Sequence, residues 1–388
     1  MTHDGQLTIL LVVKDRVPFT FRWMSYANDV RLPFHVCIAD GGADDDVQRI
    51  LSNRANFPHV KYEYVRYPLD RTYSDYFAKV ADALSRIHTP LVAMAANKDF
   101  FIIDGLGEAA AFLMSHADYV TCGGQCAAFW VDGSTMCERE STVYGQSVDW
   151  KCIREPESRS EDTARARLRN PVLWGHAIYT HVRRTELQRA HFNTLRELAF
   201  SHLFLHEQMI ECLTAIAGRS KVLDTLYVAR QWNAPDSGGR AHLDAFGGWL
   251  GCMLEPTWSD DFGKFVRVTS EALAERDGLT LDEARRYMIE TYRMEMAPAI
   301  LGDVLKEPTV SAPMSLVAGV ARRFLALSPD SVARRIARAL YRRLRWIPVD
   351  AVRGTELRSR RVPDAHRDIK PIHEFLTRHS PPGGLSPR

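Results

Sequence analysis

The first hundred residues alternate short, continuous apolar runs with longer segments of helical periodicity. Continuous runs rich in β-branched and other apolar residues are typical of strands that are covered on both faces of a sheet. The predicted strands are residues 7–13, 34–39, 60–65 and 91–96. Between the last two, residues 74–87 carry apolar side chains at helical spacing. This alternation predicts an α/β fold with a mostly parallel central sheet and right-handed crossovers.

The pattern becomes less regular after this region. A helix is predicted over 103–114, strands over 118–122, 126–131 and 222–228, and two helices within 187–217. Residues 154–170 are dense in charge and predict an exposed loop or a mobile flap. We expect an α/β domain over residues 1–235, a helical C-terminal region over 236–350, and a polar, partly disordered tail over 351–388.

Composition narrows the class of protein only slightly. An apolar content of 46% and a charged content of 25% are those of an ordinary soluble globular protein, and a net charge of +2 gives no indication of a nucleic-acid partner. Seven scattered cysteines indicate reduced thiols and no disulfide framework. The sequence shows neither an apolar signal region at its start nor a run long enough for a membrane span. We therefore expect a cytoplasmic protein.

A basic amphipathic segment lies near the C-terminus. Residues 331–346 (SVARRIARALYRRLRW) combine an apolar face with six arginines. This pattern is typical of a helix that lies on an anionic membrane, and equally of a helix that docks on its own protein with its arginines in water. Peripheral contact with the inner face of the membrane is thus one of two open alternatives.

Candidate chemistry gathers at the predicted strand ends. The strand 91–96 runs directly into Asn97, Lys98 and Asp99, and ligands of open α/β sheets bind at the C-terminal edges of strands. Polar residues follow other strands in the same way, namely Lys14-Asp15-Arg16, Asp40-Gly41-Gly42 and Arg230-Gln231. The sequence therefore predicts a polar site along one sheet edge.

These strand ends, in this order, resemble those of inverting family 2 glycosyltransferases. The segments LTILLVVKDR, WMSYAND, LPFHVCIADGG and LDTLYVARQ look similar to a bacterial subgroup of such enzymes. The likeness covers residues 6–105 well and 172–232 loosely. It implies a Rossmann-like nucleotide-diphospho-sugar transferase (GT-A) fold, a nucleotide-sugar donor, and a role in polysaccharide biosynthesis.

The resemblance also implies donor-binding roles. Asp40 would accept an N–H of the donor's base, although an aspartate that caps its own turn is the competing interpretation. Asp15 and Arg16 would meet the nucleotide, with Arg16 pairing either with phosphate or with a surface carboxylate. Arg230 would approach the diphosphate.

The triplet Asn97-Lys98-Asp99 departs from the family pattern, in which carboxylates hold the ribose and a divalent metal. If Asn97 and Asp99 are the outer members, Asp99 remains as a ligand for Mn or Mg. If Ala96 and Lys98 are, both ligands are lost and the Lys98 ammonium replaces the metal at the leaving diphosphate. Metal-dependent transfer, metal-independent transfer and loss of this activity all stay open.

An inverting transfer needs a general base beside the acceptor hydroxyl. In SHLFLHEQMIECL the best match to the family base is Glu207, with His206, on the acceptor side, or Glu211 beside it. His202 and His206 also have the spacing of metal ligands on one helix face, but no third ligand is evident. Trp174 and His176 begin the segment that would form the acceptor wall.

We therefore expect a glycosyltransferase that moves a sugar from a nucleotide-activated donor to a glycan, a lipid-linked acceptor or a small molecule. One alternative is a nucleotide- or glycan-binding protein on a degenerate scaffold of this fold. The other is a different enzyme that uses the same nucleotide-sugar pocket.

Overall fold

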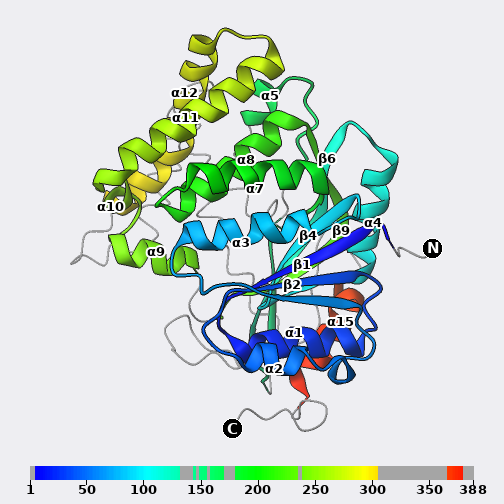
Figure 1. Ribbon diagram of the computed structural model, residues 1–388. Helices are drawn as coiled ribbons and strands as arrows, with labels where there is room; N and C mark the ends of the chain where they lie inside the picture. The colour runs from blue at the N-terminus through cyan, green and yellow to red at the C-terminus, as the bar shows by residue number, and fades with distance from the viewer. Residues whose placement is uncertain are drawn as a thin grey trace, which may run out of the picture.

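The structure is a computed structural model, and it describes residues 5–131, 143–145, 148–154, 158–169, 180–234, 238–304 and 365–378. Within these ranges the chain forms one large mixed sheet with helices on both of its faces (Figure 1). The predicted α/β class with a mostly parallel central sheet is confirmed.

The sheet has the strand order β3-β2-β1-β4-β8-β6-β9-β5, with β7 paired to β6. In chain order the strands are β1 (Leu7–Val13), β2 (His35–Asp40), β3 (Tyr62–Arg66), β4 (Leu91–Ala96), β5 (Asp99–Phe101), β6 (Tyr119–Val131), β7 (Val148–Arg154), β8 (Val182–Arg184) and β9 (Arg219–Gln231). The pairs β1–β2, β1–β4, β2–β3 and β6–β9 are parallel, whereas β8, β7 and β5 pair antiparallel with their neighbours. The apolar runs predicted at 7–13 and 91–96 coincide with β1 and β4.

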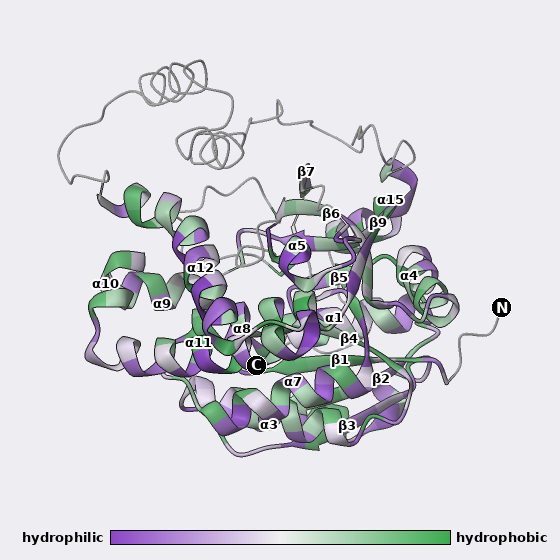
Figure 2. Ribbon diagram, turned by 90° about the horizontal axis from the view of Figure 1, so that it is seen from above, coloured by the Kyte–Doolittle hydropathy of each residue, from purple (hydrophilic) through white to green (hydrophobic). Residues whose placement is uncertain are grey.

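Helices cover both faces of the sheet. They are α1 (Val17–Asp29), α2 (Asp46–Leu51), α3 (Tyr73–Ser85), α4 (Ile103–Ser115), α5 (Ala164–Leu168), α7 (Thr185–Leu198), α8 (Leu203–Ala217), α9 (Gly238–Phe246), α10 (Trp249–Leu254), α11 (Pro256–Asp277), α12 (Leu281–Val304) and α15 (Ala365–Thr377), with a 3-10 turn at Arg54–Asn56. One core joins the sheet to α1, α2 and α4, and another joins its opposite face to α3, α7 and α8. Seen from above, the hydrophobic strands β1 and β4 run between these helices (Figure 2).

Alternation along β1 explains why its sequence is apolar throughout. Leu10 and Val12 belong to the core under α3, whereas Ile9 and Leu11 belong to the core under α1. A strand that is buried on both faces cannot carry the polar residues that half-exposed strands show. Its first polar residues therefore mark the sheet edge.

The two strands predicted at 118–122 and 126–131 are one continuous strand, β6. The glycines between the two predicted strands allow close packing. A Cβ on Gly123 would lie 2.0 Å from the His181 ring, and one on Gly124 would lie 2.4 Å from the carbonyl oxygen of Thr225. Only glycine fits where a neighbouring ring and backbone approach this closely.

The prediction of an exposed loop or flap over 154–170 is wrong for residues 164–168, which form α5. The Arg167 side chain is buried there, and its guanidinium donates to the carbonyl oxygens of Ala215 (2.6 Å) and Ile216 (3.0 Å). These carbonyls belong to the last turn of α8, where helix geometry leaves them without helical partners. One charged residue of this stretch, Arg167, therefore has a structural role, because it binds the free carbonyls at the C-terminal end of α8.

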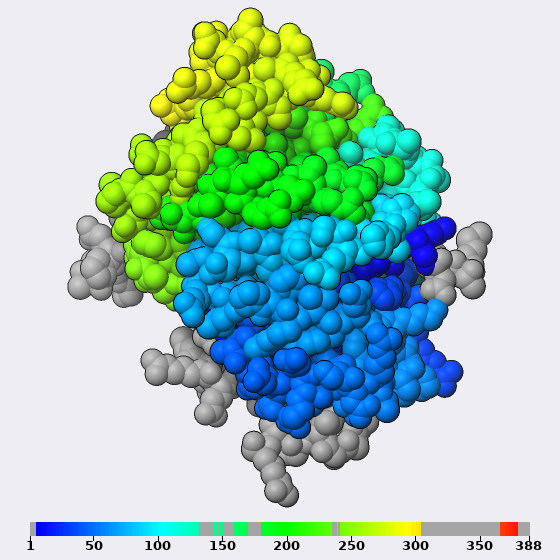
Figure 3. All heavy atoms as spheres, viewed as in Figure 1, coloured from blue at the N-terminus to red at the C-terminus, as the bar shows by residue number. Residues whose placement is uncertain are grey.

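The C-terminal helices continue the core of the α/β part. α11 packs against α8 and α12, and the buried residues of α11 and α12 belong to the same core as those of α3 and α7. In the space-filling view the yellow helices α11 and α12 lie directly against the green α7 and α8 (Figure 3). The basic segment 331–346 lies outside the described residues, so its predicted membrane contact stays a prediction, as do the domain boundaries.

The predicted polar tail contains a packed helix, α15. Its inward side chains are Ile369, Ile372, Phe375 and Leu376. Phe375 meets Tyr26 of α1 and Phe100 of β5 edge-on, with ring centroids 5.3 and 6.3 Å away. The Trp150 indole of β7 donates to the His373 ring (3.1 Å). Residues 365–377 are therefore an ordered part of the tail that was expected to be partly disordered.

Across the described part of the chain, no helix combines the length and apolarity needed to cross a membrane.

The docking of α15 leads to a test of stability. Phe375→Ala should lower the free energy of unfolding by about 3 kcal/mol, because it empties a buried aromatic site. Arg378→Ala removes only the surface pair with Asp29 (2.9 Å) and should cost less than about 1 kcal/mol. Urea unfolding of both variants measures the difference, and equal small losses would show that α15 is not docked.

Candidate active site

The predicted donor-binding residues meet at one edge of the sheet. Val13 at the end of β1 pairs with Asp40 at the end of β2, and Val12 pairs with Ala96 at the end of β4. The loops that follow these three strands are therefore neighbours. Strand order reverses between β1 and β4, which is the position where open α/β sheets bind ligands.

The junction between β1 and α1 has unusual backbone geometry. Asp15 and Arg16 both lie in the left-handed region, with φ of 55° and 53°. The Asp15 carboxylate accepts a hydrogen bond from the Ala43 amide (3.0 Å), and a Cβ on Gly42 would lie 2.9 Å from the Asp15 nitrogen. Consecutive non-glycine residues in this region are strained, and such strain gathers at functional sites.

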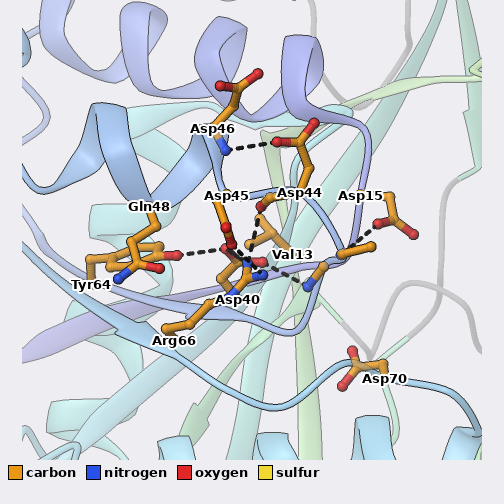
Figure 4. A network of polar contacts seen from close by, with 12 residues as sticks. Val13, Asp15, Asp40, Asp44, Asp45, Asp46, Gln48, Tyr64, Arg66 and Asp70 are labelled. Atoms are coloured by element: carbon orange, nitrogen blue, oxygen red, sulfur yellow. Dashed lines mark hydrogen bonds and ion pairs between the residues drawn. The ribbon is translucent and has the colours of Figure 1, made fainter.

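Asp40 is held inside its turn and is only 1% exposed. One carboxylate oxygen accepts from the Gly42 amide (2.8 Å), and the other accepts from the Tyr64 hydroxyl (2.6 Å) and from Arg66 (2.7 Å) (Figure 4). These contacts fit the turn-capping interpretation of Asp40. Its contact with a nucleotide base stays a prediction.

Sequence reasoning missed a buried ion pair under the same loops. The Lys79 ammonium of α3 pairs with Asp70 and donates to the carbonyl oxygen of Val13 (3.0 Å). Asp70 in turn donates its amide to the Gly41 carbonyl (2.9 Å) and lies where a Cβ on Gly41 would stand. Burial raises the pKa of Asp70 and lowers that of Lys79. The position of Lys79 on the apolar face of the predicted helix 74–87 is the sequence signal that could have indicated a buried ion pair.

The loop after β2 is acidic, and Asp15 from the loop after β1 lies beside it. Figure 4 shows Asp15, Asp44, Asp45 and Asp46 around the buried Asp40. Carboxylates accept hydrogen bonds and repel anions. This side of the edge is suited to N–H and O–H donors and not to phosphate.

The turn between β4 and β5 carries the triplet Asn97-Lys98-Asp99. The Asn97 amide is buried and donates to the Thr20 hydroxyl of α1 (3.1 Å). It therefore anchors the turn to α1, and a role for Asn97 in donor binding stays a prediction.

The Asp99 carboxylate is 4% exposed and is surrounded by donors. It accepts from Arg230 Nε (3.2 Å) and from the Gln231 amide (3.2 Å), and the Lys98 ammonium lies 3.6 Å from it. A divalent cation here would have to displace these donors and stand beside two positive charges, so Asp99 does not fit a metal site. Within the described ranges, no three His, Cys, Asp or Glu side chains group as metal ligands would.

Lys98 lies half-buried between the turn and the end of β9. Its ammonium donates to the carbonyl oxygen of Gln231 (3.0 Å). Burial is the main cause that lowers the pKa of Lys98; Asp99 opposes this shift, and the charges of Arg230 and Arg16 add to it. For Arg230, the adjacent Asp99 carboxylate raises the pKa despite the opposing effect of burial. Positive charge therefore exceeds negative charge around Asp99.

Glu207 is half-buried on the first turns of α8 and makes no hydrogen bond to the described part of the chain. Burial raises the pKa of its carboxyl to about 7, and the charge of Arg230 acts in the opposite direction. Glu207 and Arg230, predicted separately, are thus electrostatic neighbours. A carboxyl that titrates near neutral pH suits a general base.

Of the predicted acceptor-side residues, the structure describes His206 but not Trp174 or His176. His206 is fully buried, stacked on Phe77 at 4.0 Å between ring centroids, and burial lowers its pKa to about 4. The adjacent His202 hydrogen-bonds to the Thr257 hydroxyl (3.1 Å). Both histidines are core residues here, and an acceptor role for His206 stays a prediction. Trp174 and His176 lie outside the described residues.

Comparisons with known proteins match this chain to solved structures only. No protein-family model and no curated protein matches it. The crystal structure of S. aureus TarS is 13% identical, with a TM-score of 0.45, and covers 88% of this chain. This chain spans about half (53%) of that TarS chain.

Two crystal structures of TarS residues 1–349 give similar values. The complex with UDP-GlcNAc is 13% identical, with a TM-score of 0.48, covering 87% of this chain and 89% of that one. The complex with UDP is 14% identical, with a TM-score of 0.47, covering 87% of each chain. Likeness at this level assigns neither a family nor an activity to the chain.

The raised pKa of Glu207 predicts a stability effect that needs no ligand. Because its folded-state pKa lies above the ordinary 4.5, the stability it contributes is complete below about pH 4.5 and is lost as pH rises through about 7. Glu207→Gln cannot ionise, so it should unfold at the same temperature as wild type near pH 4.5. At pH 8 it should be more stable by about 1–3 kcal/mol.

Thermal unfolding at both pH values measures this difference, with Glu197→Gln on the exposed side of α7 as control. A gap between Glu207→Gln and wild type that does not depend on pH would show that the carboxyl is not perturbed.

Proposed function

We propose that the chain is a glycosyltransferase that transfers a sugar, with inversion, from a nucleotide diphosphate donor to an acceptor hydroxyl. One observation carries the proposal: Arg22, Lys98 and Arg230 converge near the single carboxylate of Asp99, at the sheet edge and beside Glu207. Unbalanced buried charge is costly unless a counter-ion offsets it. A diphosphate is an anion of suitable charge for this position.

The polarity of the edge supports an orientation for the donor. The carboxylates of Asp15, Asp40 and Asp44 suit the N–H groups of a base and the hydroxyls of a ribose. The basic end at Lys98 and Arg230 suits the diphosphate, which guanidinium and ammonium groups bind through charge-assisted hydrogen bonds. Arg16 follows β1, the strand that lies between β2, which ends at Asp40, and β4, which leads into Lys98. Arg16 therefore lies between the acidic end and the basic end of this edge.

The proposed transfer uses Glu207, Lys98 and Arg230. The acceptor oxygen attacks the anomeric carbon while the bond from that carbon to the phosphate oxygen breaks. The acceptor proton passes to the Glu207 carboxylate, and the electron pair of the broken bond leaves with the diphosphate. Lys98 and Arg230 stabilise the charge that develops on this leaving group, and no step uses a metal ion because Asp99 does not fit one.

The acceptor is the less defined partner in this proposal. A glycan, a lipid-linked sugar or a small molecule is expected from the resemblance, with Trp174 and His176 as the candidate wall. A lipid-linked acceptor would also give a reason for the basic segment 331–346. Trp174, His176 and the segment 331–346 all lie outside the described residues.

A second function is favoured by the same triplet. Lys98 already donates to the Gln231 carbonyl, and Asp99 is occupied by Arg230. This arrangement also suits a protein that binds nucleotide sugars without turning them over. Donor binding without product formation would distinguish it from the transferase.

Lys98 supplies the test of donor binding. A thermal-shift screen of nucleoside diphosphates and nucleotide sugars in EDTA should stabilise the wild-type protein with at least one nucleotide. Lys98→Met keeps the length of the chain and removes its charge, so the shift with that diphosphate should fall markedly, while any shift with the matching nucleoside should stay. A shift that requires added manganese would contradict the metal-free site.

Glu207 supplies the test of turnover. Glu207→Gln should lower the turnover number by about a hundredfold or more, the usual contribution of a general base, and should leave nucleotide binding intact. Wild-type turnover should rise with pH through about 7, because the base acts in its ionised form. Glu197→Gln serves as control; near-normal turnover in Glu207→Gln would remove Glu207 from the mechanism.

A further inference from the structure

Arg22 on α1 is a fully buried arginine that sequence reasoning did not single out. Its Nη1 donates to the Gln231 side-chain oxygen (2.6 Å) and to the Val143 carbonyl (2.9 Å). Its Nη2 donates to the Lys98 carbonyl (3.0 Å). One guanidinium therefore joins α1, the turn between β4 and β5, the end of β9 and the segment before β7.

Three of these groups form a closed ring. Arg22 holds the carbonyl of Lys98, the Lys98 ammonium holds the carbonyl of Gln231, and the Gln231 side chain holds Arg22. The amide of Gln231 also binds Asp99. Lys98 is thus fixed both at its backbone and at its charged end, and the backbone contact belongs to Arg22.

Aromatic rings fix the plane of the guanidinium. Its central carbon lies 4.6 Å from the ring centroid of Phe19 and 5.0 Å from that of Phe100. Phe100 is supported in turn by Tyr26, with ring centroids 4.8 Å apart, and by Phe375 of α15. A planar fork of donors between rings is a geometry that arginine meets and lysine does not.

The charge of Arg22 is retained at neutral pH. Burial lowers its pKa to about 9, and Tyr144 and Asp99 oppose this shift. Even at that value the guanidinium is protonated at pH 7. It therefore supplies both its hydrogen bonds and its positive charge under ordinary conditions.

We propose that Arg22 is a positioning residue that sets Lys98 and the end of β9, which carries Arg230, for the diphosphate of the donor. The role rests on the function proposed above. Arg22 does not itself touch the donor, because its side chain is fully buried and its Nη groups donate hydrogen bonds to groups of the protein. Its loss would leave Lys98 and Arg230 present but no longer held at a fixed separation.

The first arm of the test reports on Lys98 without any nucleotide. Amine-reactive labelling of the whole protein, read residue by residue by mass spectrometry, measures how readily each lysine reacts. In Arg22→Lys and Arg22→Met, Lys98 should react roughly fivefold faster than in wild type or more, a factor that corresponds to losing about one hydrogen bond. Lys264, which is half-exposed on α11, should react at an unchanged rate.

Lys79 serves as the check on folding, because its ammonium is buried in the ion pair with Asp70. A variant in which Lys79 also becomes reactive has unfolded, and the comparison then rests on the other Arg22 variant or on labelling at lower temperature. Unchanged labelling of Lys98 in folded Arg22→Lys and Arg22→Met would overturn the proposal.

The second arm separates this inference from the proposed function. With the nucleoside diphosphate that stabilises wild type most, both Arg22 variants should lose most of the thermal shift, and the turnover number should fall at least about tenfold. Binding of the matching nucleoside should not change. If wild type binds no nucleotide, the proposed function fails, whereas the labelling result still decides the role of Arg22.

Discussion

Excess positive charge, buried beside one carboxylate at the edge of a sheet, is the constraint on which the rest of this site depends. Lys98 and Arg230 both contact Asp99, and Arg22 lies behind them with no acidic side chain in contact among the described residues. Like charges held this close together repel, and burial adds to their cost. The fold offsets that cost with backbone carbonyls and aromatic faces, and the anion that we propose to bind at this cluster would offset more of it.

Distant parts of the chain converge to hold this arrangement. α1 contributes Arg22, the turn after β4 contributes Lys98, and β9 contributes Arg230 and Gln231. Phe375 of α15, which follows Phe100 by 275 residues in the chain, packs against that ring. The charges are thus positioned by elements that are themselves part of the core. Two further features of this region lower the free energy of unfolding. The backbone of Asp15 and Arg16 lies in the left-handed region, and burial of the Glu207 carboxyl raises its pKa.

The local sequence pattern was enough to predict most of the fold, but it did not predict the buried arginine Arg22 behind Lys98 and Arg230. Continuous apolar runs identified β1 and β4 at their observed bounds, and strand ends identified Lys98, Asp99 and Arg230 as neighbours along one edge. Arg22 was missed because one arginine on an amphipathic helix looks like a solvent-facing residue. Arg167 was missed because it lies in a charge-dense stretch that was predicted as a loop, whereas the α8 carbonyls that it binds lie about fifty residues away. A buried cation is defined by partners remote in sequence, and periodicity carries no information about them.

The most direct measurement is a crystal structure of the protein grown with a nucleoside diphosphate in the presence of EDTA. We expect phosphate oxygens within hydrogen-bond distance, about 3 Å, of the Lys98 ammonium and the Arg230 guanidinium, with no metal ion between them. A diphosphate bound away from both residues would contradict it. So would binding that is seen only when a divalent cation is restored and coordinated by Asp99.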